Sequence, residues 1–148
     1  MQIRRLSEGD LPELIALYSH LHSRDTPLPA QDVVDSVWAE LMANPRYRYY
    51  GAFVDEQMVS SCALTVIPNL TRSCRPYGII ENVVTHAGHR RKGYAASLLR
   101  HALNEAWKAD CYKVMLLTGR KDEATFRFYE QAGFERQSKQ AFLARPPG

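Results

Sequence analysis

The chain has 148 residues, a formal net charge of +3 and 45% hydrophobic residues. This length suits one domain with a sizeable core, and the composition is that of an ordinary globular protein. The net charge is too small to indicate a nucleic-acid-binding surface, and no apolar run approaches the roughly 20 residues of a membrane span. We therefore expect a single domain over residues 1–148 that binds neither nucleic acid nor a membrane.

The cysteines and histidines carry no metal-site pattern. Cys62, Cys74 and Cys111 are odd in number, widely spaced and outside any Cys-x-x-Cys pair, which is typical of reduced thiols in a cytoplasmic protein. The charged, alternating start of the chain does not resemble a signal peptide, so we expect a cytoplasmic location. His20 and His22 lack helical metal-site spacing and Cys/His partners, so no metal is predicted.

Hydrophobic periodicity and turn residues predict the elements along the chain. Ser7 and Asp10 form a capping-box pattern at the start of the first helix, and Gly133 ends the last one. In chain order we predict a strand at 1–6, a helix to about residue 22, a helix at 33–42, strands at 49–54, 58–67 and 77–85, a helix at 95–106, a strand at 112–119, a helix at 123–131, and one or two strands within 134–144.

This order predicts an α/β fold with one mixed, largely antiparallel twisted sheet and helices on both faces. The meander from residue 49 to residue 85 predicts antiparallel pairing, and the helical crossover that follows predicts a central parallel strand pair. Residues 112–119 are nearly continuous in apolar side chains, so we expect them to form a central strand covered on both faces.

The segment "HRRKGYAAS", residues 89–97, joins a strand to a helix and concentrates positive charge at the helix N-terminus. Unpaired N–H groups and the helix dipole already favour an anion there. Gly93 and Ala95 permit close approach to the backbone, and the three cations at 90–92 add charge, which together suits a pyrophosphate. The alternative is a solvated basic turn. The P-loop and GxGxxG patterns are absent.

The segment Arg90-x-x-Gly93-x-Ala95 resembles motif A, [Q/R]-x-x-G-x-[G/A], of the GNAT superfamily of acyl-CoA-dependent N-acetyltransferases. A second segment, "DEATFRFYEQAGF" at 122–134, is similar to another motif of that family, although Asp122, Thr125 and Arg91 depart from its usual residues. The resemblance implies the GNAT fold and acetyl-CoA as cosubstrate. It also implies cofactor contacts at Val83, Val84, Thr85, Arg90, Arg91, Lys92, Gly93, Tyr94, Ala95, Asp122 and Phe128.

Acetyl transfer to an amine requires an acid for the leaving thiolate, donors for the oxyanion and a neutral amine. By the resemblance, Tyr129 is the general acid and a backbone N–H of Val84 or its neighbour polarises the thioester. The alternative for Tyr129 is a core aromatic. Glu81 lies in an otherwise apolar strand, where we expect it to be half-buried, and it is the candidate base, acting directly or through a water. The alternative for Glu81 is an ion pair with a neighbouring strand.

The strand "YGIIENVV" and the segment "CYK" at 111–113 resemble the glucosamine-6-phosphate N-acetyltransferase branch of the family. That likeness makes Arg72 and Arg75 candidate sugar-phosphate ligands, because arginine binds phosphate through a bidentate fork. The alternative is two arginines in a solvated loop. Asn82 is a further candidate substrate ligand, and residues 20–29 are expected to line the acceptor pocket.

The resulting hypothesis is an acetyl-CoA-dependent N-acetyltransferase that acts on the primary amine of a small molecule. The alternative is a non-catalytic acyl-CoA-binding sensor or interaction module with the same fold. A nucleic-acid-binding module is disfavoured, because the basic turn is small and no aromatic stacking platform is evident. The family resemblance also makes a homodimer plausible.

Overall fold

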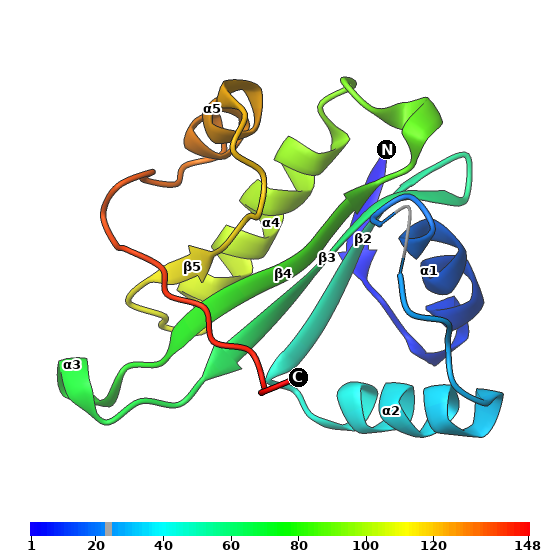
Figure 1. Ribbon diagram of the computed structural model, residues 1–148, viewed down its shortest axis with the longest axis horizontal. Coiled ribbons are helices and arrows are strands. Elements are labelled where there is room, and N and C mark those ends of the chain that lie inside the picture. The colour runs from blue at the N-terminus through cyan, green and yellow to red at the C-terminus, as the bar shows by residue number, and fades with distance from the viewer. Residues whose placement is uncertain (23–24) are drawn as a thin grey trace.

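The computed structural model describes residues 1–22 and 25–148. Five strands form one sheet in the order β1-β2-β3-β4-β5 (Figure 1). The strands are β1 (Gln2–Arg5), β2 (Tyr47–Val54), β3 (Gln57–Ile67), β4 (Tyr77–Thr85) and β5 (Val114–Leu116). The helices are α1 (Leu11–Tyr18), α2 (Gln31–Ala43), α3 (Thr71–Cys74), α4 (Tyr94–Lys108) and α5 (Glu123–Gln131), with short 3-10 turns η1 (Glu8–Asp10) and η2 (Ala87–His89).

The sheet is mixed, as the element order predicts. The first four strands pair antiparallel with their neighbours, and β4 pairs with β5 in parallel after the crossover through α4. Helices α1 and α2 lie on one side of the sheet, and α4 crosses the other (Figure 1). Among the described helices, none combines the length and the apolar character that a membrane crossing requires.

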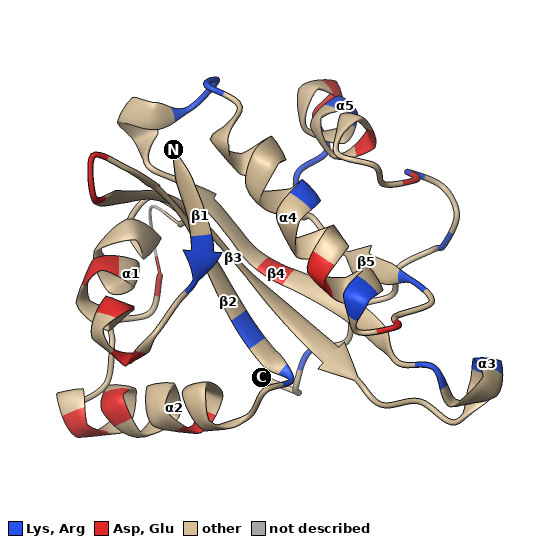
Figure 2. Cartoon of the chain, turned by 180° about the vertical axis from the view of Figure 1, so that it is seen from behind, with Lys and Arg blue, Asp and Glu red and all other residues tan. Residues whose placement is uncertain are grey.

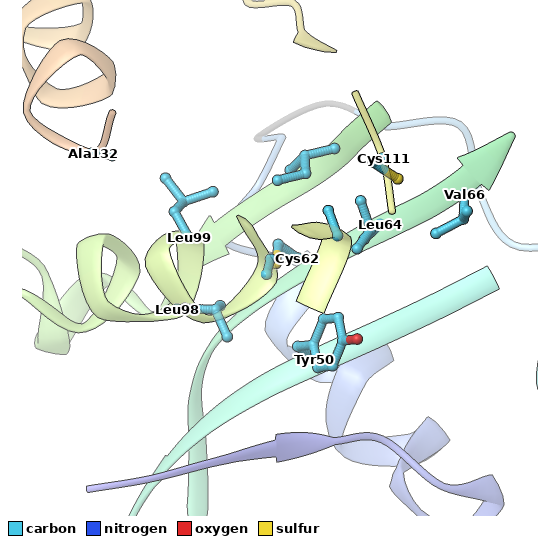
Figure 3. Packing of buried hydrophobic residues seen from close by; sticks show 11 residues of the cluster. Tyr50, Cys62, Leu64, Val66, Leu98, Leu99, Cys111 and Ala132 are labelled. Atoms are coloured by element: carbon cyan, nitrogen blue, oxygen red, sulfur yellow. The ribbon is translucent and has the colours of Figure 1, made fainter. Parts of the chain in front are cut away.

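Each face of the sheet has its own apolar core. On the α4 face, Leu98 and Leu99 are fully buried in one cluster with Cys62 and Leu64 of β3 (Figure 3). On the other face, Leu14 and Leu17 of α1 and Trp38 of α2 pack in a second cluster. Because β3 separates the two cores, it is buried over nearly its whole length. All three cysteines are free thiols.

The strand expected to be central, residues 112–119, is in fact the short edge strand β5. Only Val114–Leu116 pair with β4, and their side chains are half-buried, whereas β3 holds the centre of the sheet. Two serines in β3 made its central place in the sheet hard to predict from the sequence. Ser60 and Ser61 are fully buried and satisfied, because their hydroxyls donate to the carbonyl oxygens of Val84 at 2.8 Å and Tyr50 at 3.0 Å.

The strands predicted within residues 134–144 do not form in the described chain. Residues 135–148 are exposed, and Phe142 is 91% accessible, so their alternating pattern finds no face of the sheet to cover. Instead, Arg136 holds the start of this segment to α5 through Glu123 and Glu130. The preceding α5 helix matches its predicted range and ends before Gly133, whose φ of +109° is left-handed.

A β-bulge interrupts β4 at the level of Cys62. Two residues of β4, Asn82 and Val83, lie opposite that single residue of β3, and Asn82 has a φ of +53°. Asparagine tolerates this left-handed conformation better than most residues do. A bulge bends and twists its strand, and here the paired part of β5 ends at Leu116, opposite Ile80, just before the bulge.

Candidate functional site

The second half of β4 has a free edge where β5 stops. Residues 81–85 continue beyond the last pair with β5, and no described strand pairs with them on that side. The Val84 carbonyl accepts a hydrogen bond from Ser60 and thus faces β3, so strand alternation turns the backbone of Thr85 toward the free edge. Apart from the Thr85 carbonyl, which accepts a hydrogen bond from Arg90, the backbone groups of this edge can bind an extended ligand as an additional strand does.

The free edge leads into the turn before α4, and the geometry of this turn fits an anionic group. Gly93 adopts a φ of +80° at the N-cap, and Arg91 is also left-handed at +62°. The backbone bond from Ser97 N to Gly93 O opens the helix. The amides of Tyr94, Ala95 and Ala96 therefore have no partner within the helix, and these amides suit the pyrophosphate of CoA.

The three cations of the turn have different roles in the structure. Arg90 braces the turn, because its guanidinium donates to the His20 carbonyl at 3.0 Å and to the Thr85 carbonyl at 3.4 Å. Arg91 and Lys92 are exposed at the tip of the turn. These two residues supply the free positive charge at the helix N-terminus.

A pair of histidines joins the turn to the region after α1. The rings of His20 and His86 are 4.1 Å apart, and Ala87 N donates to Nδ1 of His20 at 3.2 Å. Desolvation lowers the pKa of His20, and the neighbouring charges of His86 and Arg90 lower it further. His20 therefore favours the neutral form, whose unprotonated nitrogen accepts the Ala87 amide.

Helix α5 brings Tyr129 and Phe128 to the same side of the sheet as α4. Both side chains are half-buried against the α4 core, and Tyr129 also packs edge-on against Phe134 at 6.2 Å. Burial raises the pKa of Tyr129, and Arg120 opposes this only in part. Tyr129 therefore holds its proton at neutral pH, as a general acid must.

Asp122 caps α5 and is already engaged within the chain. Its carboxylate accepts hydrogen bonds from Arg120 Nε at 2.8 Å and from the amide and hydroxyl of Thr125. The Arg120 interaction, followed by those with Thr125, lowers the pKa of Asp122 to about 2. This carboxylate fixes the start of α5, and with it the orientation of the helix that carries Tyr129.

Glu81 and Asn82 are exposed side by side on β4, so the expectation that Glu81 is half-buried is wrong. The reason is that β5 ends opposite Ile80 and leaves Glu81 without a covering strand. No ion pair of Glu81 occurs among the described residues, so the predicted alternative, an ion pair with a neighbouring strand, is not realised in the described chain.

Arg72 and Arg75 lie at the opposite end of β4 from the turn (Figure 1). Arg75 forms an ion pair with Asp110 at 3.1 Å, and Arg72 lies over the Tyr112 ring at 5.7 Å. Seven residues of extended chain separate Arg75 from Asn82, about 20 Å at the usual rise of a strand. The structure therefore does not bring these arginines together with Glu81 and Asn82 in this chain.

A pocket that the sequence did not reveal lies between α1, α2 and the sheet. Its volume is about 290 Å³, and it reaches Asn82 on β4. Tyr18 of α1, Trp38 of α2 and Tyr49 of β2 contribute aromatic walls. Of residues 20–29, which were expected to line the acceptor pocket, only Leu28 and Pro29 line this one among the described residues, and Ser23 and Arg24 lie outside the described residues.

The turn before α4 and the helices α1 and α2 carry charges of opposite sign (Figure 2). The turn at residues 90–92 carries three cations. Helices α1 and α2 carry acidic residues and no lysine or arginine. The field therefore favours an anionic ligand at the turn and a cationic ligand beside α1 and α2.

The comparison with known families agrees with this geometry. Residues 14–134 match the acetyltransferase (GNAT) family. The chain belongs to this family. The sequence prediction of the GNAT fold is therefore confirmed, and N-acetyltransferase activity follows as the family's chemistry. GNAT acetyltransferases generally use acetyl-CoA.

Individual relatives cover the whole chain. A solved structure of a proposed acetyltransferase from Agrobacterium tumefaciens str. C58 is 42% identical, with a TM-score of 0.91 over 99% of this chain and 100% of that one. The glucosamine 6-phosphate N-acetyltransferase of Trypanosoma brucei brucei is 27% identical over 97% of this chain and 95% of its own length. A glucosamine-6-phosphate N-acetyltransferase from Arabidopsis thaliana shares the fold at a TM-score of 0.82 and 20% identity, over 97% of each chain.

Proposed function

We propose that this GNAT protein transfers the acetyl group of acetyl-CoA to the primary amine of a small molecule. One observation carries the proposal: the free edge of β4 runs directly into the Gly93 turn, where unpaired amides and exposed cations meet. An extended pantetheine arm with a pyrophosphate at its end matches these two adjoining features. Val83 and Thr85 contact the arm, and the residues from Arg90 to Ala95 contact the phosphates.

The reaction is a direct attack that forms one bond and breaks one bond. The amine nitrogen attacks the thioester carbon, and a backbone amide next to Val84 on β4 stabilises the oxyanion. The C–S bond then breaks, and the thiolate takes the hydroxyl proton of Tyr129. The ammonium proton passes through a water to Glu81, and solvent exchange returns Tyr129 to its protonated form. The products are an amide and CoA as the free thiol.

Two features support the catalytic assignments. Tyr129 is half-buried on α5, and its raised pKa keeps the proton available for the thiolate. Glu81 is exposed and free of ion pairs among the described residues, next to Asn82 at the pocket. An exposed carboxylate acts through water, because a solvent molecule can bridge it to the acceptor.

The competing function is a sensor that binds acyl-CoA without catalysis. Both functions require the donor site, so acetyl-CoA should raise the melting temperature in either case. Only the enzyme releases CoA when an amine is added. The test is therefore a thermal-shift titration with acetyl-CoA, followed by a thiol-release assay over a panel of primary amines. Stabilisation without CoA release from any amine would favour the sensor, and the absence of both would reject the donor site.

A further inference from the structure

The lining of the pocket between α1 and α2 points to a particular class of acceptor. Its walls are aliphatic and aromatic side chains, including Leu14, Val34 and Val37, and no charged side chain lines it among the described residues. Asn82 contributes the amide at its β4 end. A phosphate or a carboxylate placed in such a pocket loses its hydration and gains no cationic partner.

The two tyrosines of the pocket do not supply charge either. Burial raises the pKa of Tyr18 and also raises the pKa of Tyr49. Both phenols therefore stay neutral throughout the physiological pH range. The pocket favours an apolar body and offers polar contacts near β4.

The helices that form the pocket are acidic (Figure 2). Glu13 belongs to α1, and Asp32, Asp35 and Glu40 belong to α2, all outside the pocket lining. The Glu13 carboxylate accepts a hydrogen bond from the Met58 amide. Because neither helix carries a lysine or arginine, the local field attracts an ammonium group and repels a phosphate. The arginines that would bind a sugar phosphate lie at the other end of β4, where Arg75 is paired with Asp110.

We propose that the acceptor is a primary amine on an apolar body, such as an arylalkyl or alkyl amine, and not a phosphorylated amino sugar. This inference rests on the proposed acetyltransferase function. The apolar body fills the pocket between α1 and α2, and the amine reaches Asn82 and Glu81 on β4. The net negative charge of α1 and α2 attracts the ammonium form, and transfer into the apolar pocket then favours the neutral amine that attacks the thioester.

The first experiment compares acceptors in the CoA-release assay with the full chain and saturating acetyl-CoA. The panel contains phenethylamine, hexylamine, ethanolamine, glucosamine and glucosamine 6-phosphate. We expect kcat/KM for the two apolar amines to exceed that for glucosamine 6-phosphate by at least about a hundredfold, because several methylene or ring contacts contribute. Equal or higher activity with glucosamine 6-phosphate would overturn the inference and leave the acetyltransferase function intact.

The second experiment tests the pocket itself. Val37 lines the pocket and is 51% exposed, so Val37→Asp adds a charge without burying it in the core. We expect kcat/KM for phenethylamine to fall at least about tenfold, and the milder Val37→Thr to reduce it about threefold. Ser36→Asp is the matched control, because Ser36 is an exposed neighbour on α2 outside the pocket. Its kcat/KM should stay within about twofold of the wild-type value.

Two further measurements distinguish these outcomes: the rise in melting temperature with acetyl-CoA, and the oligomeric state by sedimentation. All three variants should keep the wild-type rise in melting temperature with acetyl-CoA, because the donor site lies on the other side of β4. Unchanged phenethylamine kinetics in Val37→Asp would overturn the pocket assignment. A wild-type dimer that Val37→Asp converts to monomer would show that a second copy covers the pocket, which also overturns the inference. If no amine releases CoA, the acetyltransferase function fails first, and this inference fails with it.

Discussion

The basic turn before α4 and the apolar pocket between α1 and α2 both adjoin β4, but the chain builds them in opposite ways. The turn comes from one contiguous segment, residues 86–95, and its backbone and charges serve together. The pocket draws side chains from α1, α2, β2 and β4, which are far apart in the sequence. The basic turn can therefore be recognised as a sequence motif, whereas the pocket forms only when distant segments fold together.

The two regions are also physically joined. Arg90 of the turn donates to the carbonyl of His20, which follows α1, and the His20 ring stacks near His86. A change at one region can reach the other through this contact. Experiments that separate donor from acceptor effects should therefore use residues outside it.

The largest effect is expected at Tyr129, the proposed general acid. Tyr129→Phe removes the acidic proton and keeps the ring that packs against Phe134. We expect kcat to fall by about 10²–10⁴-fold, with the Kd for acetyl-CoA changed less than about threefold. Stopped-flow or thiol-release kinetics and calorimetry measure the two quantities.

The pH profile provides the control for this variant. Since burial raises the pKa of Tyr129, ionisation of this residue should lower wild-type kcat only at a pH above the range in which a free tyrosine ionises. Tyr112→Phe is a matched change at a tyrosine that packs on Tyr77, at the far end of β4, and should be neutral. Equal kcat in Tyr129→Phe and wild type would exclude Tyr129 as the acid.

Local signals in the sequence were sufficient to predict β4 and α5. The ranges of β4 and α5 match their predictions, because turn residues bound both elements clearly. The motif requires glycine at position 93, and the structure gives Gly93 a positive φ, which glycine tolerates. Asp122 departs from the usual residue of the motif, and the sequence did not reveal that its carboxylate caps α5 and pairs with Arg120.

Non-local pairing explains what the sequence could not provide. The β-bulge at Asn82 depends on the register between β3 and β4, and it decides where β5 ends and why Glu81 is exposed. The apolar run at 112–119 looked central because hydrophobicity alone does not reveal how many partners a strand has. The only local signal of the pocket was the apolar stripe of α2, where Val33 and Val37 remain exposed.

The second prediction tests whether the ligand occupies the space beside Gly93. A Cβ at this position meets no protein atom within 4 Å, but the φ of +80° disfavours alanine by about 1 kcal/mol. We expect Gly93→Ala to weaken acetyl-CoA binding about tenfold by calorimetry. Gly119→Ala is the control, because that glycine also has open space and no left-handed φ. A loss of stability without a loss of affinity would mean that Gly93 serves the fold alone.

A smaller effect is expected from the exposed cations of the turn. Replacing Arg91 and Lys92 together by glutamine should weaken acetyl-CoA binding about three- to tenfold at low salt. The difference should shrink in 0.5 M NaCl, because salt screens exposed charges. The Kd for acetyl-pantetheine, which lacks the pyrophosphate, should not change. An equal rise in Kd for both ligands would mean that the two cations support the fold and do not contact the phosphates.

The smallest effect concerns the acceptor side, where an ion pair fixes the start of α1. Asp10 is buried, and its carboxylate accepts from Arg4 at 2.8 Å and from the amide of Ser7 at 2.7 Å. The Arg4 hydrogen bond is the main cause that lowers the pKa of Asp10 to about 2. Because this pKa is lowered on folding, the stabilisation is complete above pH 4, the range of the unfolded carboxyl, and is lost as the pH falls toward 2.

Arg4 is partly exposed, so we expect Asp10→Asn to reduce the unfolding free energy by about 1 kcal/mol at pH 7. In urea titrations the wild-type and variant curves should converge between pH 4 and 2, while the acetyl-CoA affinity stays constant. A difference that persists below pH 2 would assign the effect of Asp10 to packing and not to its charge.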